Sequence, residues 1–402
     1  MKSQSRSNNE TASIDRRSFF KTAGTVAAGA AAAMVPPMPT LLSASIAGEN
    51  QGGVLTRTLG RTGLKVSAIG LGTIPLFRAP RDQAVEVIKK SIDNGITFID
   101  TARGYREGYS EECLGVATKG IRDKLVILSK SGNRTDKIAD DVDKSLNALQ
   151  TDFIDIYCFH SLDSDEQWKK VLGPNGALEA LKRAKQAGKI RFIGMSSHRS
   201  DFLTECISTG ELDVAVTPFN FVFDDAIYDL IPKAKEMNVG LAGIKPFGGG
   251  FIQYAELSLR WILQQQFDVT CPGMWQVDEV IQNTRILRDP QPLIATELEY
   301  LHEERQLLYY ELCRFCNVCK PCPKGIPYLN IVMTPLMLRR QGLALELGER
   351  KQKKPLLNAL DKIEQCDNCG TCINSCKYHL PIIDLMKNVK RQFYNPIKYY
   401  KV

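Results

Sequence analysis

The sequence predicts an α/β fold: a closed (β/α)8 barrel of the TIM type, followed by a small, mainly helical module. Short apolar, β-branched runs alternate eight times with helical patterns from Leu55 onward, as parallel βα units do. The 402 residues also suffice for a barrel of roughly 250 residues and a second, smaller module. The eight predicted strands are residues 68–71, 97–99, 125–128, 153–159, 190–195, 214–217, 239–244 and 268–271.

A doubly wound parallel sheet is the alternative arrangement of such units. We favour the closed barrel because no GxGxxG motif follows the first strand and the last unit can close beside the first. The barrel is placed at residues 54–290, with Pro290 and Pro292 marking its end. A connecting helix is expected within 291–312 and the second module at 313–402, while residues 1–47 form a separate leader.

The composition is that of an ordinary globular protein, with 44% hydrophobic and 24% charged residues. The net charge of +7 is concentrated near the C-terminus, because residues 331–402 hold 13 Lys and Arg against 6 Asp and Glu. This excess either solubilises the small module or binds an acidic electron-transfer partner. Basic residues are not interleaved with aromatic ones, so we expect no nucleic-acid binding.

Three ionisable residues end successive predicted strands. Asp100, Lys130 and His160 are 30 residues apart in each step, about the length of one βα unit. They should therefore lie at the same height on neighbouring strands, at the C-terminal edge where barrel enzymes carry their chemistry. Tyr105 follows Asp100 by five residues. A single charge at a strand end commonly just faces water, but this repeated spacing indicates a site.

The motifs around these residues resemble the aldo/keto reductase family over residues 54–290. RTLGRTGLKVS at 57–67 and GLGT at 70–73 resemble its opening hairpin and first strand, and FIDTA at 98–102 its second strand. The resemblance implies interconversion of a small carbonyl compound and an alcohol. Tyr105 would be the general acid. An unperturbed phenol, with a pKa of about 10, is too weak an acid for this role without help. Lys130 would lower that pKa, Asp100 would position Lys130, and His160 would orient the carbonyl.

Two residues near this tetrad leave alternatives open. The segment between Tyr105 and Ser110 is two residues longer than is usual in the family, so Tyr109 competes for the role of the acid. His198 lies in a loop beside the expected pocket, where it either contacts substrate or is simply solvated.

The hydride donor implied by the resemblance is a nicotinamide cofactor, NAD or NADP. Some of the contact residues that are usual in the family are replaced. Ser197, Val216 and Ile244 occupy the positions where the family commonly has an asparagine, a glutamine and an aromatic residue, respectively. Glu279 stands where a 2′-phosphate would be bound, and a carboxylate repels phosphate, so NAD is favoured over NADP if either binds. The contacts implied by the resemblance are Ser196, Asn220, Lys245, Gly273 and Asn283.

Two runs of cysteine dominate the C-terminal module. Their spacings, CxxCxxCxxCP and CxxCxxCxxxC, suit two 4Fe–4S clusters in which each iron takes one thiolate. Zinc sites use well-separated CxxC pairs, and a disulfide framework does not explain three successive CxxC steps. The runs comprise Cys313, Cys316, Cys319 and Cys322, then Cys366, Cys369, Cys372 and Cys376.

These runs resemble those of bacterial two-cluster ferredoxins, in which the fourth cysteine of each run binds the other cluster. The resemblance implies that Cys376 completes the set begun by the first run, and that Cys322 completes the set begun by the second. The four remaining cysteines are expected to be buried thiols in the barrel, namely Cys113, Cys158, Cys206 and Cys271.

The N-terminus resembles a twin-arginine export signal. Arg16 and Arg17 precede a weakly apolar, alanine-rich stretch that ends at Pro36, which is shorter than the roughly 18 residues expected of a membrane span. A membrane anchor is the alternative. We expect recognition by the twin-arginine export machinery, cleavage that leaves a mature start near Gly48, no stable membrane span after cleavage, and a location in the periplasm or on the outer face of a membrane.

These features support an exported iron–sulfur oxidoreductase in which the clusters relay electrons to or from the barrel. The alternative is an electron-transfer protein whose barrel binds a partner or ligand without using nicotinamide. A third hypothesis, in which the clusters only stabilise a small module, explains one cluster better than two.

Overall fold

A computed structural model describes residues 35–43, 45–341, 347–348 and 351–400. The twin-arginine motif and most of the apolar stretch after it lie outside these described residues. Residues Met38–Val402 form one compact unit. Among the described residues, no helix combines the length and the apolar character needed to cross a membrane.

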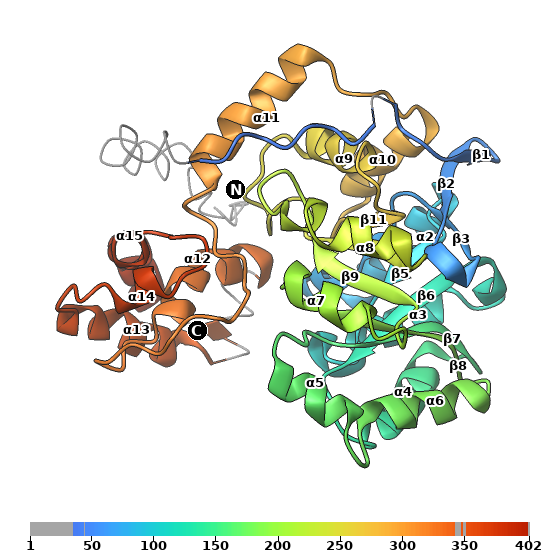
Figure 1. Ribbon diagram of the computed structural model, residues 1–402, viewed down its shortest axis with the longest axis horizontal. Helices are drawn as coiled ribbons and strands as arrows, with labels where there is room; N and C mark the ends of the chain where they lie inside the picture. The colour runs from blue at the N-terminus through green and yellow to red at the C-terminus, as the bar shows by residue number, and fades with distance from the viewer. Residues whose placement is uncertain (1–34, 44, 342–346, 349–350, 401–402) are drawn as a thin grey trace, which may run out of the picture. The chain divides into compact units, whose positions relative to one another are not determined.

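An antiparallel three-stranded sheet, β1 (Glu49–Gln51), β2 (Val54–Thr58) and β3 (Lys65–Ser67), precedes the barrel. The barrel is one parallel sheet in the order β4 to β11, with every strand beside its neighbour in sequence (Figure 1). Its strands are β4 (Leu71–Gly72), β5 (Phe98–Asp100), β6 (Val126–Ser131), β7 (Ile154–Phe159), β8 (Ile190–Ser196), β9 (Val214–Pro218), β10 (Gly240–Ile244) and β11 (Val269–Cys271).

The ends of this sheet meet through parallel bridges from Ile69 to Thr270 and from Gly72 to Gly273. This arrangement confirms the eight-stranded barrel over a doubly wound sheet. The first strand is shorter than its sequence predicts, because the chain runs very close to its neighbours there. A Cβ atom on Gly72 would lie 3.0 Å from the Cys271 carbonyl oxygen, and one on Gly70 2.8 Å from that of Phe98.

Helices cover the outside of the barrel, each burying one apolar face. In α4, for example, Ile138, Val142, Ser145 and Leu149 are buried at helical spacing. The barrel helices are α2 (Arg81–Asp93), α3 (Tyr109–Ala117), α4 (Ile138–Leu149), α5 (Asp165–Leu172), α6 (Ala177–Gln186), α7 (Ser200–Ile207), α8 (Leu230–Glu236), α9 (Ala255–Leu263) and α10 (Val277–Arg288).

The barrel interior is packed with side chains from alternate strand positions, including Phe98, Leu128, Ile156, Val216 and Val269. Two of the cysteines outside the cysteine runs, Cys158 and Cys271, belong to this core. All four of those cysteines are buried, as expected for thiols that serve only packing.

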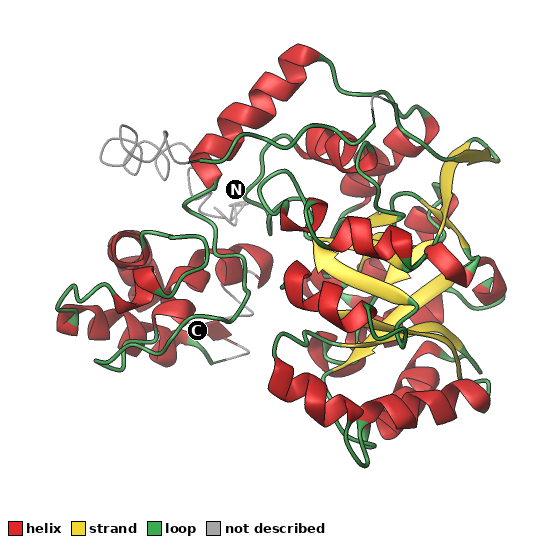
Figure 2. Cartoon of the chain, viewed as in Figure 1, coloured by secondary structure: helices red, strands yellow, loops and turns green. Residues whose placement is uncertain are grey.

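In the cysteine-rich module, the described residues form helices and loops without a strand (Figure 2). The longest helix, α15, buries Ile382, Met386, Val389, Phe393 and Ile397 on one face against the other helices. The mainly helical character predicted for this part agrees with the structure. The helices are α11 (Ala295–Leu308) before the first cysteine, then α12 (Tyr328–Gln341), α13 (Lys353–Asp361), α14 (Thr371–Asn374) and α15 (Ile382–Tyr399).

Candidate active site

Asp100 and Lys130 form a buried ion pair at the C-terminal edge of the barrel sheet. Asp100 ends β5 and Lys130 lies near the end of β6, so the parallel register brings them together. Lys130 Nζ lies 2.7 Å from Asp100 Oδ1 and donates to the Thr101 carbonyl oxygen at 2.8 Å. The two residues are only 1% and 3% exposed. Burial opposes the charge on Lys130, but the Asp100 carboxylate outweighs it and raises the pKa of Lys130 above its usual value.

Tyr105 and His160 complete this cluster. The Lys130 ammonium nitrogen lies 5.5 Å from the centre of the Tyr105 ring. The Tyr105 ring meets the His160 ring edge to face, with their centres 5.7 Å apart. The four residues that the sequence spacing singles out are therefore neighbours at one end of the barrel.

Tyr109, the competing candidate for the acid, points elsewhere. Its hydroxyl donates to the Ala79 carbonyl oxygen at 2.9 Å. The intervening Arg106 and Glu107 both have positive φ angles, 47° and 55°, so they form a left-handed turn that separates the two tyrosines. The geometry favours Tyr105 over Tyr109 as the residue that faces Lys130 and His160.

The His160 imidazole is neutral at physiological pH. Burial, reinforced by the positive charges of Lys130, Lys245, His198 and Arg134, lowers its pKa to about 3. A neutral imidazole can donate a hydrogen bond to a carbonyl oxygen without itself delivering a proton.

Replacing His160 by Gln should make the protein less sensitive to acid. The folded-state pKa of about 3 lies below the unfolded value of about 6.5, so the unfolded chain binds the proton more tightly than the folded chain does. His160 therefore removes stability progressively as the pH drops from about 6.5 toward 3. Urea unfolding at pH 7.5 and pH 5 measures the effect, with the exposed His302→Gln as the control. An equal acid-induced loss in wild type and His160→Gln would contradict the assignment.

A second polar chain crosses the same end of the barrel, of which sequence reasoning singled out Ser197, His198 and Lys245. His198 Nε2 lies 2.9 Å from Lys245 Nζ, and its Nδ1 faces Asp163 Oδ2 at 3.7 Å. Asp163 also accepts from Ser197 Oγ and from the backbone N–H of His198, both at 2.8 Å. Asp163 was missed; the available signal was its place three residues after His160, in the same strand-end loop.

The residues predicted to contact nicotinamide lie on the strands and helix of this same edge, but several already serve the fold. The Asn220 side chain donates to the Lys245 carbonyl oxygen at 2.9 Å and accepts from the backbone N–H groups of Val222 and Phe223. Ser196 Oγ accepts from the Ser161 N–H at 2.8 Å. Gly273 lies at the barrel seam, where a Cβ would contact Pro75 at 3.0 Å, and Asn283 is buried in α10.

Glu279 caps the N-terminus of α10. Its Oε2 accepts from the backbone N–H groups of Trp275 at 2.8 Å and Gln276 at 3.2 Å. The Arg78 guanidinium lies 4.4 Å from the centre of the Trp275 ring. The helix end that would attract a phosphate is thus already occupied by a carboxylate of the chain itself.

The eight cysteines of the two runs fall into two sets. Cys319 and Cys376 are hydrogen-bonded through their sulfurs, and Cys313 and Cys316 lie near enough to interact electrostatically with Cys376. We call Cys313, Cys316, Cys319 and Cys376 the first cysteine group. A small pocket is lined by the other four, Cys322, Cys366, Cys369 and Cys372, which we call the second cysteine group. This division follows the crossed pairing expected from the sequence.

Backbone geometry around the cysteines suits a cluster. Phe315, Asn317 and Asn368 lie between successive cysteines at positive φ angles of 64°, 56° and 57°. Such turns point backbone N–H groups inward, as at many iron–sulfur sites. The N–H groups of Phe315 and Val318 donate to the sulfurs of Cys313 and Cys316.

Among the described residues, no three His, Cys, Asp or Glu side chains converge on a point where a single metal ion would bind. A cubane cluster needs a different arrangement, because each thiolate binds its own iron at a separate corner.

Comparison with known proteins shows which family the barrel resembles. Residues 68–256 match the sequence profile described as "Aldo/keto reductase family". L-galactose dehydrogenase of Arabidopsis thaliana is 31% identical over 214 residues, which cover 49% of this chain and 66% of that protein. Aldo-keto reductase YhdN of Bacillus subtilis (strain 168) is 32% identical over 198 residues, covering 44% of this chain and 57% of that protein. The chain thus spans less than two thirds of the length of each of these relatives.

A similar fold occurs in the crystal structure of an aldo/keto reductase from Klebsiella pneumoniae in complex with NADP and acetate. The TM-score is 0.54 at 24% identity, covering 62% of this chain and 95% of that one. A parallel barrel with polar residues at the C-terminal ends of its strands has the layout of a (β/α)8-barrel enzyme. Residues 68–256 of the barrel are thus similar to the aldo/keto reductase family.

Proposed function

We propose that the barrel is an oxidoreductase that interconverts a small carbonyl compound and an alcohol. The observation that supports this best is the buried Lys130–Asp100 pair beside the Tyr105 and His160 rings. The Lys130 charge favours the phenolate form of Tyr105, which eases proton transfer to a carbonyl oxygen. His160, being neutral, orients that oxygen by hydrogen bonding.

We further propose that the two cysteine groups each hold one 4Fe–4S cluster. Their division into two sets of four, with backbone N–H groups directed at the sulfurs, supports this proposal. Clusters of this type would supply one-electron transfer. The chain's own contribution is to supply the thiolates and the hydrogen bonds that stabilise their charge.

Among nicotinamide cofactors, NAD suits this chain better than NADP. The reason is Glu279, whose carboxylate caps α10 where the 2′-phosphate of NADP would bring a second negative charge. Ser196, Asn220, Lys245, Gly273 and Asn283 would lie around the cofactor.

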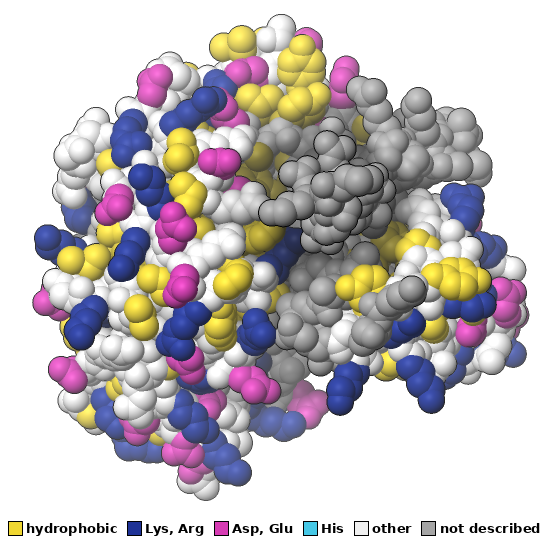
Figure 3. Space-filling view, turned by 180° about the vertical axis from the view of Figure 1, so that it is seen from behind, with side chains coloured by type: hydrophobic (Ala, Val, Ile, Leu, Met, Phe, Trp, Pro, Cys, Tyr) yellow, Lys and Arg dark blue, Asp and Glu magenta, His cyan; other side chains and the backbone are white. Residues whose placement is uncertain are grey.

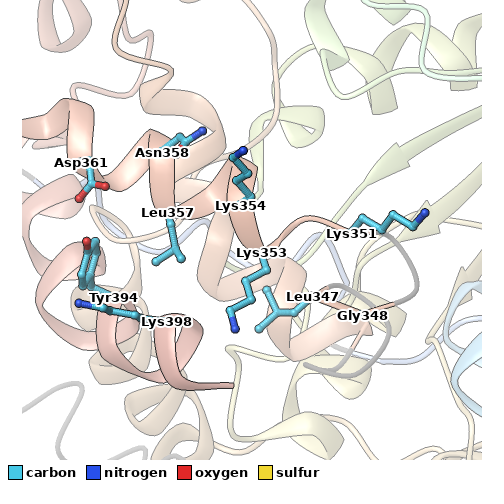
Figure 4. A pocket seen from close by; sticks show the side chains of 10 residues that line it. All are labelled: Leu347, Gly348, Lys351, Lys353, Lys354, Leu357, Asn358, Asp361, Tyr394 and Lys398. Atoms are coloured by element: carbon cyan, nitrogen blue, oxygen red, sulfur yellow. The ribbon is translucent and has the colours of Figure 1, made fainter. Parts of the chain in front are cut away.

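The proposed setting is the periplasm or the outer face of a membrane, reached by the twin-arginine route. An acidic electron-transfer protein is the partner that the charge of the module favours. Figure 3 shows basic side chains beside hydrophobic ones on one face of the molecule. One pocket of the module has Lys351, Lys353, Lys354 and Lys398 around Leu357 and Tyr394, with Asp361 as its acidic member (Figure 4).

The decisive experiment is purification without oxygen, followed by counts of iron, sulfide and released nicotinamide. We expect about eight irons per chain, from two clusters of four, and binding of NAD in preference to NADP. Cys322→Ser should alter the spectroscopic signal of the cluster held by Cys366, Cys369 and Cys372, and the exposed Ser208→Ala serves as the control. Two signals that both survive Cys322→Ser unchanged would contradict the crossed pairing.

The second candidate is an electron-transfer protein whose barrel does not use nicotinamide. Asn220 favours it, because the side-chain amide expected to bind cofactor is already engaged by backbone groups. Eight irons without nicotinamide binding at millimolar concentration would support this candidate and overturn the first.

A further inference from the structure

We infer that the first cysteine group is the one in electronic contact with the barrel site, and that the second cysteine group exchanges electrons with the outside carrier. This inference rests on the proposed function, because it assigns an order to the two clusters proposed above. It follows from where the residues next to each cysteine make their contacts.

The residues flanking the first cysteine group bind the C-terminal edge of the barrel. Arg314, beside Cys313, is 4% exposed and its guanidinium lies 3.5 Å from Asp225 Oδ2. The Asn317 side chain donates to Asp163 Oδ2 at 3.3 Å.

The residues after Cys376 bind the same edge. Lys377 Nζ lies 3.2 Å from Asp201 Oδ2. The Tyr378 hydroxyl lies 3.2 Å from Asp225 Oδ2, and the Tyr378 ring stacks on Arg314 at 4.0 Å. Both cysteine runs thus anchor this one group to loops that follow β7, β8 and β9.

Phe315 makes the contact closest to the chemistry. Its backbone lies between Cys313 and Cys316, while its ring centre is 5.7 Å from that of His198 and 5.3 Å from Lys245 Nζ. Lys245 in turn is close enough to His160 for its charge to add to the effect of burial in lowering the pKa of His160. One aromatic ring therefore joins the first cysteine group to the polar chain of the candidate active site.

Backbone strain marks the same contact. Phe315 and Lys245 have φ angles of 64° and 55°, a left-handed conformation that bulky residues rarely adopt. Strained residues persist where the surrounding structure holds them and cluster at functional sites. Here two such residues, distant in sequence, face each other across the junction.

The second cysteine group is the more exposed of the two. Cys369 is exposed, and it is the one exposed residue of the eight. Flanking polar residues pair within the module, as Lys324 does with Asp367 at 3.5 Å and Lys362 with the Gly325 carbonyl oxygen at 3.5 Å.

The electron balance fits this order. A reduced one-electron carrier is oxidised at the second group, and its electron reaches the barrel through the first group. Reduction of one carbonyl would draw on two reduced carriers, and Tyr105 would supply one of the protons. The sum is two electrons and two protons per carbonyl, and alcohol oxidation reverses every term.

Redox titration of the oxygen-free protein, followed by electron paramagnetic resonance, tests the order. Cys316→Ser and Cys369→Ser identify the signals of the two clusters. Lys245→Met removes a positive charge beside Phe315 and should disfavour an added electron nearby. At a fixed potential we expect a several-fold lower ratio of reduced to oxidised first cluster, with the second unchanged. The exposed Lys235→Met should change neither.

A second measurement needs no variant. A dysprosium chelate in solution should speed the magnetic relaxation of the second cluster more than that of the first, because Cys369 is exposed and Arg314 is buried at the junction. Equal effects on both clusters, or a Lys245→Met shift confined to the second, would overturn the inference. If either of these contrary results appears in protein with a full complement of iron, the order of the two clusters is wrong but the proposed function stands. Protein with too little iron to form two clusters would overturn both the order and the proposed function.

Discussion

Tyr105→Phe should lower kcat/KM for carbonyl reduction by roughly 10²- to 10⁴-fold, the usual contribution of a positioned general acid. The phenol oxygen is the only part removed, and the ring that carries it lies beside Lys130 and His160. Assays with a panel of small aldehydes, using the loaded protein and its electron donor, measure the loss.

Tyr109→Phe is the matched control. Its hydroxyl bonds the Ala79 carbonyl oxygen, so its removal should leave kcat/KM near the wild-type value and cost about 1 kcal/mol of stability at most. A loss in Tyr109→Phe as large as that in Tyr105→Phe would contradict the assignment, and so would full activity in Tyr105→Phe.

Lys130→Met should destabilise the fold by about 3–5 kcal/mol, because it leaves the Asp100 carboxylate buried without its partner. Burial would also drive Asp100 to take up a proton, so the loss should be larger at pH 8 than at pH 5. Urea unfolding at the two pH values measures both effects.

Two further variants make this test specific. The double variant Lys130→Met with Asp100→Asn removes the stranded charge and should recover part of the stability. Lys170→Met breaks an exposed pair with Glu166, at 2.8 Å, and should change stability by less than about 1 kcal/mol. A Lys130→Met protein as stable as Lys170→Met would show that the buried pair has little role in the fold.

Much of the site could be predicted because a barrel repeats. In a parallel sheet of βα units, residues one unit apart reach the same edge, so the spacing of Asp100, Lys130 and His160 already placed them side by side. The cysteine runs were readable for a similar reason, since CxxC spacing is local and a turn can present its thiolates without help from distant residues.

Contacts between distant segments could not be predicted this way. The spacing left Tyr105 and Tyr109 both open as the acid, and the left-handed turn at Arg106 and Glu107 separates them. The sequence indicated that the Glu279 carboxylate would repel a phosphate. Its role as the cap of α10 depends on the backbone N–H groups of Trp275 and Gln276, which donate to it in the folded chain.

The amino-acid sequence thus determined the barrel, the strand-end positions of Asp100, Lys130 and His160, and the two cysteine runs, because periodicity and short spacing encode them locally. Only the tertiary structure decided that Phe315 meets His198 and Lys245, and that Arg314 is buried against Asp225. These pairs are separated by many residues along the chain, and packing rather than any sequence pattern brings them together. The physical link between the barrel site and the cysteine-rich module is therefore a property of the folded chain.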